Sequence, residues 1–237
     1  KDQIIKICDR NFIGCDQLIF IESSKSTDAN LKFFNSDGGE SGACGNGTRC
    51  IAKLISNETK NETVILTTLN GDLKSQILEN NIVTTEIGNA KIEWNEIPLS
   101  KKSDTKNLNI KIIDVNDKEY FGGTAVNVGN PHVVFFVDKI ENFNIEKIGP
   151  QVENYNIFPE KCNVTIAKIV DKNLIKVKVW ERGAGLTKAC GTAACATAFA
   201  GKLNNLTENK TDIEFQTGRL SIFIDDKDSI HMKGPVS

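Results

Sequence analysis

Gly42-Ala43-Cys44-Gly45-Asn46-Gly47 and Lys188-Ala189-Cys190-Gly191-Thr192-Ala193 are two copies of one pattern, Ala-Cys-Gly followed by a segment with helical periodicity. Strand-like segments and a loop precede each copy, and further strand-like segments follow it. A second cysteine lies inside each helical segment, at Cys50 and Cys195. The matching order of elements predicts an internal repeat and therefore two similar halves of the α+β class.

The rest of the chain can be divided into elements around these two copies. Asn70-Gly71 is a strong signal for a β-hairpin. The polar segment 99–107 is the best candidate for a linker, which predicts an N-terminal half at 1–105 and a C-terminal half at 106–237. We expect helices at 1–10, 45–56, 145–151 and 191–203, and strands at 18–22, 31–35, 63–68, 72–78, 82–87, 108–115, 124–128, 133–137, 163–170, 174–180, 212–215 and 220–224.

Composition excludes several classes of function. The net charge of −2 gives no large basic surface, so nucleic acid is not an expected partner. No apolar run approaches the roughly 20 residues that cross a bilayer, and no secretory signal opens the chain. Seven cysteines is an odd number in a chain large enough to build its own core, which favours reduced thiols in the cytoplasm. Cys8, Cys15 and Cys162, like Cys50 and Cys195 within the helical segments, are expected to be packing residues.

Cys44 and Cys190 stand apart because each lies where a helix is expected to begin. The first backbone N–H groups of a helix have no intrahelical partner, and the helix dipole places about half a positive charge there. Both effects favour a thiolate. One such group from each half, facing the other across a cleft, could remove a proton from one side of a carbon and return a proton to the other side. The pattern therefore predicts inversion of a stereocentre by two cysteines.

Other uses of these cysteines are less well supported. No lysine motif typical of pyridoxal enzymes and no glycine-rich nucleotide loop is evident, so we expect no cofactor. The spacing between the cysteines is not that of a zinc site, so we expect no metal. A Cys44–Cys190 disulfide would be an oxidised, inactive form. A nucleophilic cysteine paired with His132 remains open, but it does not explain why the motif occurs twice.

The motifs together resemble the diaminopimelate epimerase family. The resemblance extends along nearly the whole chain and rests on Asn35-Ser36-Asp37-Gly38, Cys44-Gly45-Asn46-Gly47-Thr48-Arg49-Cys50, Gly129-Asn130-Pro131-His132, Glu181-Arg182-Gly183-Ala184-Gly185 and Ala189-Cys190-Gly191-Thr192. It implies two pseudo-symmetric domains, each a mostly antiparallel, barrel-like sheet around a central helix. It also implies interconversion of L,L- and meso-diaminopimelate, on the route to lysine and peptidoglycan precursors.

The resemblance also implies roles for individual residues. Cys44 would be the proton donor and Cys190 the acceptor, with the labels depending on the direction of reaction. Arg182 could bind a distal carboxylate through two parallel hydrogen bonds, while Glu181 could hold an ammonium group. The remaining residues implied in substrate binding are Gln17, Asn35, Gly45, Asn46, Asn130, His132, Asn163, Gly191 and Thr192.

Three features depart from the family pattern. The family opens with a strand and a His-Gly-x-Gly-Asn-Asp-Phe loop, and it closes with a strand beyond a Gly-Pro motif. The present sequence has no such loop and ends at Gly234-Pro235-Val236-Ser237, so we expect both ends to be trimmed. Ala193-Ala194 stands where the family usually has Gly-Ala.

Two alternative functions remain. One is a proline or hydroxyproline racemase of the same fold, and Glu181 and Arg182 argue against it because they suit a substrate with a charged distal end. The other is a thiol redox or binding protein that has kept the scaffold without catalysis, which the missing ends would favour. The expected partner is a small-molecule substrate. A homodimer is compatible with the sequence, which does not set the oligomeric state.

Overall fold

The computed structural model describes residues 1–42 and 44–236, so Ala43 of the first cysteine motif and Ser237 at the end of the chain lie outside the described residues. The chain divides into two compact units. The first comprises Lys1–Glu86 and Pro235–Ser237, and the second comprises Ile87–Gly234. Of the helices within the described ranges, none combines the length and the apolarity that a bilayer crossing demands.

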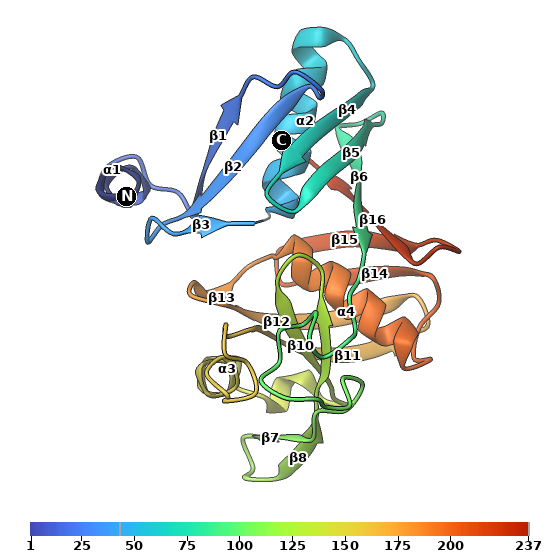
Figure 1. Cartoon of the computed structure of the whole chain (residues 1–237). Helices are drawn as coiled ribbons and strands as arrows, with labels where there is room; N and C mark the ends of the chain where they lie inside the picture. The colour runs from blue at the N-terminus through green and yellow to red at the C-terminus, as the bar shows by residue number, and fades with distance from the viewer. Residues whose placement is uncertain (43, 237) are drawn as a thin grey trace. The chain divides into compact units, whose positions relative to one another are not determined.

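The first unit packs one long helix against a sheet (Figure 1). Its strands are ordered β1-β2-β4-β5-β6, and the short β3 pairs with β2. The β2–β4 pair is parallel, and the other pairs along this path are antiparallel. Its elements are α1 (Asp2–Cys8), β1 (Gln17–Glu22), β2 (Ala29–Asn35), β3 (Glu40–Ser41), α2 (Gly45–Thr59), β4 (Thr63–Thr68), β5 (Gly71–Ile77) and the start of β6 (Ile82–Asn89).

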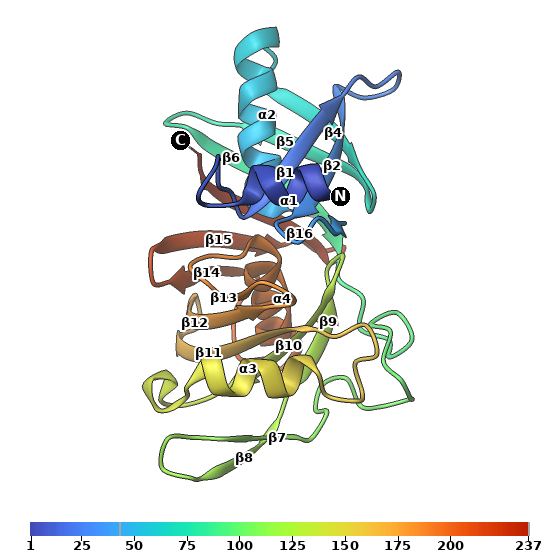
Figure 2. The same ribbon diagram turned by 90° about the vertical axis from the view of Figure 1, so that its left-hand side faces the viewer.

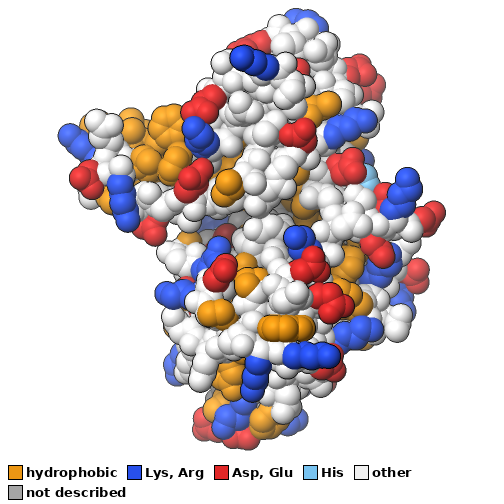
Figure 3. Space-filling view, viewed as in Figure 1, with side chains coloured by type: hydrophobic (Ala, Val, Ile, Leu, Met, Phe, Trp, Pro, Cys, Tyr) orange, Lys and Arg blue, Asp and Glu red, His pale blue; other side chains and the backbone are white. Residues whose placement is uncertain are grey.

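The core of the first unit follows from the two periodicities of its elements. Alternate residues of β2, among them Leu31 and Phe33, point to one face of the sheet and are buried there. Ala52 and Ile55 lie one helical turn apart on α2 and pack into the same cluster. The unit leaves an apolar surface over α1 and β1 (Figure 3), where the exposed large hydrophobic residues are Ile5, Phe12, Ile13, Phe20 and Ile21.

The second unit is a curved sheet with a helix on each face (Figure 2). Its main strands are ordered β16-β15-β14-β12-β11-β10-β9, with β13 paired to β12, and β7 and β8 form a separate hairpin. Its elements are β7 (Ile110–Ile113), β8 (Glu119–Gly122), β9 (Thr124–Asn127), β10 (Pro131–Phe136), the 3-10 turn η1 (Ile140–Asn142), α3 (Ile145–Glu153), β11 (Asn163–Asp171), β12 (Leu174–Glu181), β13 (Gly185–Thr187), α4 (Gly191–Leu203), β14 (Lys210–Phe215), β15 (Gly218–Ile224) and β16 (Ser229–Pro235).

Helix α4 lies inside the curve of this sheet. It contacts β9 and β10 at one end of the strand order and β14 and β15 toward the other end. Every residue from Gly191 to Gly201 is buried, and most of these side chains are small. A helix that is apolar all round belongs in a core, and small side chains let surrounding strands approach it closely.

Helix α3 covers the opposite face, so strand β10 is buried on both sides. Val133 and Phe135 belong to the cluster that contains Ile148 of α3, whereas Val134 belongs to the cluster that contains α4. This explains why β10 is a nearly continuous apolar run rather than an alternating one. The two clusters form the layers above and below the sheet.

The α+β fold class is confirmed, as are most of the predicted elements. Strands β4 and β5 form the predicted hairpin, with Thr68 paired to Gly71. Helix α2 continues three residues beyond its predicted end, to Thr59. The predicted strand at 108–115 is shorter, at Ile110–Ile113, and strands β3, β8, β13 and β16 were not predicted.

Candidate active site

Cys44 is the N-cap residue of α2, as predicted. Its backbone is extended, and its Sγ accepts a hydrogen bond from the Gly47 N–H at 3.3 Å. A Cβ atom at position 47 would come within 2.9 Å of this sulfur and 2.5 Å of Ile19 Cδ1. Glycine is therefore required at position 47 for the thiol to reach the backbone amides at the start of the helix.

The residues after Cys44 are held by a buried arginine. Arg49 is 3% exposed, and its Nη2 donates to Asn46 Oδ1 at 2.9 Å. Its Nη1 donates to the Gly45 carbonyl at 3.3 Å. Arg49 was part of the quoted motif but had no predicted role. Its position three residues after Asn46 on a helix is the signal that could have identified it.

Gln17 and Asn35 lie opposite each other in the β1–β2 register. The Gln17 Nε2 donates to Asn35 Oδ1 at 2.8 Å. The Asn35 backbone N–H donates to the Gly39 carbonyl, which fixes the turn that follows β2. The first unit thus pairs Gln17 with Asn35, two of its three predicted substrate-binding amides, whereas Asn46 bonds to Arg49.

Cys190 is the N-cap residue of α4, and it is 6% exposed. Its Sγ lies 3.4 Å from Thr192 Oγ1. Burial raises the pKa of the Cys190 thiol well above its ordinary value of 9.0, and the Glu181 carboxylate raises it further. Hydrogen bonds from Thr192 and from the Ala193 amide act in the opposite direction and are weaker causes.

The helix N-terminus was expected to favour a thiolate at Cys190, but the pKa of this buried thiol is raised. Desolvation penalises the charged form of a group, and at this position it outweighs the helix dipole. Cys190 forms no disulfide, and its raised pKa favours the protonated thiol. The sequence could not reveal this, because the strands that bury Cys190 come from distant parts of the chain.

His132 is fully buried on β10. Its Nε2 lies 2.8 Å from Asn130 Oδ1, and its Nδ1 has no hydrogen-bond partner among the described residues. Burial, together with the charge of Arg182, lowers the pKa of His132 to about 3. Because an amide oxygen only accepts, the proton of the neutral ring lies on Nε2 and leaves Nδ1 as an acceptor.

Asn163 connects His132 to the loop that carries the predicted charges. It is paired with His132 across the parallel strands β10 and β11. Its Nδ2 donates to the Pro131 carbonyl at 3.0 Å, and its Oδ1 accepts from the Arg182 backbone N–H at 2.9 Å. The Arg182 Nη1 donates to the Glu160 carbonyl at 2.9 Å. Asn163 therefore fixes the backbone at position 182.

The second unit brings its predicted residues into one connected set. Asn130, His132, Asn163 and Arg182 are linked by hydrogen bonds, by strand pairing or by charge. Glu181 adjoins Arg182 in the chain and raises the pKa of the Cys190 thiol, whose Sγ contacts Thr192 Oγ1. Gly191 is the first residue of α4 and is buried.

Glu153, the last residue of α3, was not predicted as a site residue, and it is 6% exposed. Its carboxylate accepts hydrogen bonds from Trp180 and from Gly183, on either side of the Glu181-Arg182 pair. No motif signals its role, because the contact joins elements that are far apart in sequence.

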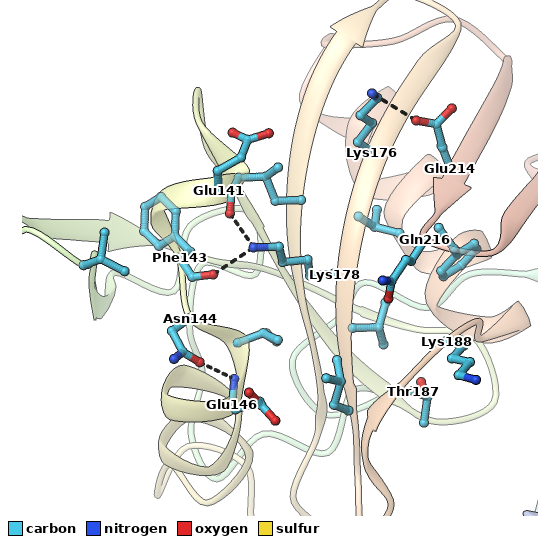
Figure 4. A pocket seen from close by; sticks show the side chains of 17 residues that line it. Glu141, Phe143, Asn144, Glu146, Lys176, Lys178, Thr187, Lys188, Glu214 and Gln216 are labelled. Carbon is cyan, nitrogen blue, oxygen red and sulfur yellow. Dashed lines mark hydrogen bonds and ion pairs between the residues drawn. The ribbon is translucent and has the colours of Figure 1, made fainter.

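A separate cavity of about 650 Å³ lies in the second unit, among η1, the start of α3, β12 and β14 (Figure 4). None of the predicted site residues lines it. The Lys178 ammonium within it donates to the carbonyls of Ile140 and Phe143, and Lys176 pairs with Glu214 at 3.1 Å. Lys176 and Lys178 therefore already bind groups of the chain itself.

Comparison with known proteins supports the family assignment. The family model described as diaminopimelate epimerase matches residues 1–93 and 124–237. A diaminopimelate epimerase of Pelagibacter ubique strain HTCC1062 is 65% identical over 237 residues, which are 100% of this chain and 86% of that protein. A diaminopimelate epimerase of Acidiphilium cryptum is 39% identical over 233 residues, covering 98% of this chain and 82% of that protein.

Solved structures show the same fold at low identity. A hydroxyproline epimerase from Agrobacterium vitis, with bound trans-4-hydroxy-L-proline, has a TM-score of 0.71 at 11% identity and covers 99% of this chain and 76% of that chain. A predicted epimerase from Pseudomonas aeruginosa has a TM-score of 0.69 at 13% identity, covering 99% and 86%. The family model and the sequence relatives decide the assignment, and the chain belongs to the diaminopimelate epimerase family of isomerases.

Proposed function

We propose that this protein interconverts L,L- and meso-diaminopimelate without a cofactor, in the formation of lysine and peptidoglycan precursors. The observation that carries the proposal is that Cys44 and Cys190 each occupy the N-cap position of a helix, in a chain 65% identical to a relative of that name. Two thiols in equivalent positions of a repeat match the need of inversion for one acid–base group on each face of a carbon.

The reaction balances with these two groups alone. One thiolate takes the α-hydrogen as a proton, and the electron pair of the broken C–H bond stays on the α-carbon. The other thiol then donates its proton to the opposite face, which forms the new C–H bond. Nothing is oxidised or reduced. Backbone N–H groups at the starts of α2 and α4 supply fixed dipoles for the negative charge that develops.

Glu181 gives substrate binding a direct effect on Cys190. Its carboxylate raises the pKa of the Cys190 thiol in the resting protein. A substrate ammonium bound to Glu181 would neutralise that carboxylate and so lower the pKa of Cys190. With its pKa lowered, the Cys190 thiol would release its proton to solvent as the substrate binds, and the resulting thiolate could accept the α-proton.

Hydrogen exchange in D₂O tests this function. The reduced full-length protein should incorporate deuterium at one α-carbon of L,L-diaminopimelate and form the meso product, with no label in proline. Deuterium in proline without label in diaminopimelate would assign the protein to the racemases. A folded, reduced protein that labels neither substrate would exclude the proposed activity and favour a binding or redox role.

A further inference from the structure

Glu153 is a buried carboxylate that no catalytic step uses. It ends helix α3, and its side chain is 8% exposed. Its Oε2 accepts the Trp180 Nε1–H at 2.7 Å, and its Oε1 accepts the Gly183 backbone N–H at 3.1 Å. The ammonium of Lys161 lies 3.9 Å from Oε1, at the surface end of the group. Both oxygens of the buried carboxylate are therefore bonded to N–H donors.

Helix α3 also holds Trp180 through packing. Gly149 lies one turn before Glu153 on the same helix, and a Cβ atom there would come within 2.3 Å of Trp180 Cγ. The indole therefore lies directly against the helix backbone, with its Nε1 directed to Glu153. Trp180 cannot move away from α3 without losing both the packing and the hydrogen bond.

The two residues between these contacts are Glu181 and Arg182. Trp180 is anchored before them and Gly183 after them, and the Arg182 N–H is held by Asn163. Gly183 has a φ of +73°, a conformation that glycine adopts without strain, and the residue itself is exposed. The turn is closed by the Ala184 N–H bond to the Glu181 carbonyl and by the pairing of Glu181 with Gly185, and the Glu153 bond ties its exposed Gly183 to helix α3.

We propose that Glu153 is a positioning residue, which fixes Glu181 and Arg182 for the substrate through its bonds to Trp180 and Gly183. This inference rests on the proposed function for the roles of Glu181 and Arg182. A carboxylate is required because it only accepts hydrogen bonds and has two oxygens to offer. Glutamine has one oxygen, and its NH₂ group would face a second N–H donor.

The test uses Glu153→Gln, Trp180→Phe and the double variant, with Glu146→Gln as the matched control. Glu146 is exposed in the first turn of the same helix, so its substitution makes the same change of charge without touching the loop. In Glu153→Gln we expect KM for diaminopimelate to rise roughly tenfold, with kcat within about threefold of wild type, because a buried donor loses its acceptor. A role in folding alone would lower the melting temperature and the active fraction and leave KM unchanged.

The double variant gives the sharper result. Trp180→Phe removes the donor that the NH₂ group of the introduced glutamine would face, so the remaining amide oxygen can accept from Gly183. We expect KM of the double variant to fall below that of Glu153→Gln alone, and KM of the Glu146→Gln control to match wild type. Multiplicative effects of the two single substitutions, or an unchanged KM in Glu153→Gln, would overturn the proposal.

Amide exchange at Gly183 provides a readout that does not depend on activity. We expect slow exchange in the wild type and in Trp180→Phe, and fast exchange in Glu153→Gln. Exchange in the wild type at the rate of an exposed loop amide would overturn the inference even if Glu153→Gln fails to fold. A wild type that protects Gly183 but does not turn over diaminopimelate would instead contradict the proposed function and leave the anchoring intact.

Discussion

The two cysteine turns have the same local design and different surroundings. Cys44 and Cys190 both precede a glycine and both cap a helix. Helix α2 buries one side only, leaving Cys44 half-buried and Cys50 exposed, whereas α4 is enclosed and Cys190 is 6% exposed. A repeated motif therefore sets the same backbone geometry twice without setting the same electrostatic environment.

The charges beside the two turns differ as well. Five residues after Cys44 stands the buried Arg49, and five residues after Cys190 stands the buried Cys195. Glu181 acts on Cys190 from β12 and raises the pKa of its thiol. The second turn is thus more deeply buried and lies next to a negative charge. Both conditions favour the protonated form of Cys190. The two cysteines are therefore expected to differ in how readily each gives up a proton.

The largest expected effect is the loss of turnover when either cysteine is removed. Cys44→Ala and Cys190→Ala should each reduce epimerisation by about 10³-fold or more, because each removes one of two obligatory acid–base groups. Cys50→Ala is the matched control, since Cys50 lies on the same helix as Cys44 and is exposed. Product formation measured with the purified, reduced variants shows whether each cysteine is needed for turnover. Turnover retained by Cys190→Ala would refute the two-cysteine mechanism.

The next effect is a loss of folding stability at low pH, caused by the buried His132 of the second unit. The pKa of His132 is lowered from 6.5 to about 3 in the folded protein. Between these two pH values the unfolded chain binds a proton at His132 and the folded chain does not. The stability due to neutral His132 is complete above pH 6.5 and is lost as the pH falls toward 3. The loss is about 1.4 kcal/mol per pH unit, or about 2 kcal/mol by pH 5.

Urea unfolding of the wild type and of His132→Gln at pH 7 and pH 5 measures this effect. The wild type should lose about 2 kcal/mol more than the variant over that interval. Equal losses in the two proteins would show that His132 is not the group responsible.

The smallest effect is a change in the reactivity of the two thiols toward an alkylating reagent. Without substrate at pH 8, Cys44 should react faster than Cys190, because Cys190 is buried and its thiol has a raised pKa. Glu181→Gln should increase the rate at Cys190 by about threefold, since it removes a nearby negative charge. Peptide mapping by mass spectrometry follows each cysteine separately. A faster rate at Cys190 than at Cys44 in the wild type would reverse the comparison.

Local signals account for the parts of the fold that were predicted correctly. The helix starts at Gly45 and Gly191, and the hairpin at 63–77, depend on residues that are neighbours in the chain. Strand β16 was not predicted, because its inward residues Ile230 and Met232 are buried by pairing with β15 and by the cluster around α4. Packing roles were predicted for both Cys50 and Cys195, and only Cys195 is buried, because only α4 is enclosed.

The sequence by itself determined that two cysteines would cap two helices in an internal repeat, and that the chain would be an α+β protein. Those features arise from local backbone preferences and from short motifs. Only the tertiary structure decided that Cys190 rests as a thiol and that Glu153 anchors the turn carrying Glu181 and Arg182. Desolvation and side-chain contacts depend on strands and helices that come together only in the folded chain. The pair of cysteines is therefore encoded in the motif, and the difference between them is encoded in the packing.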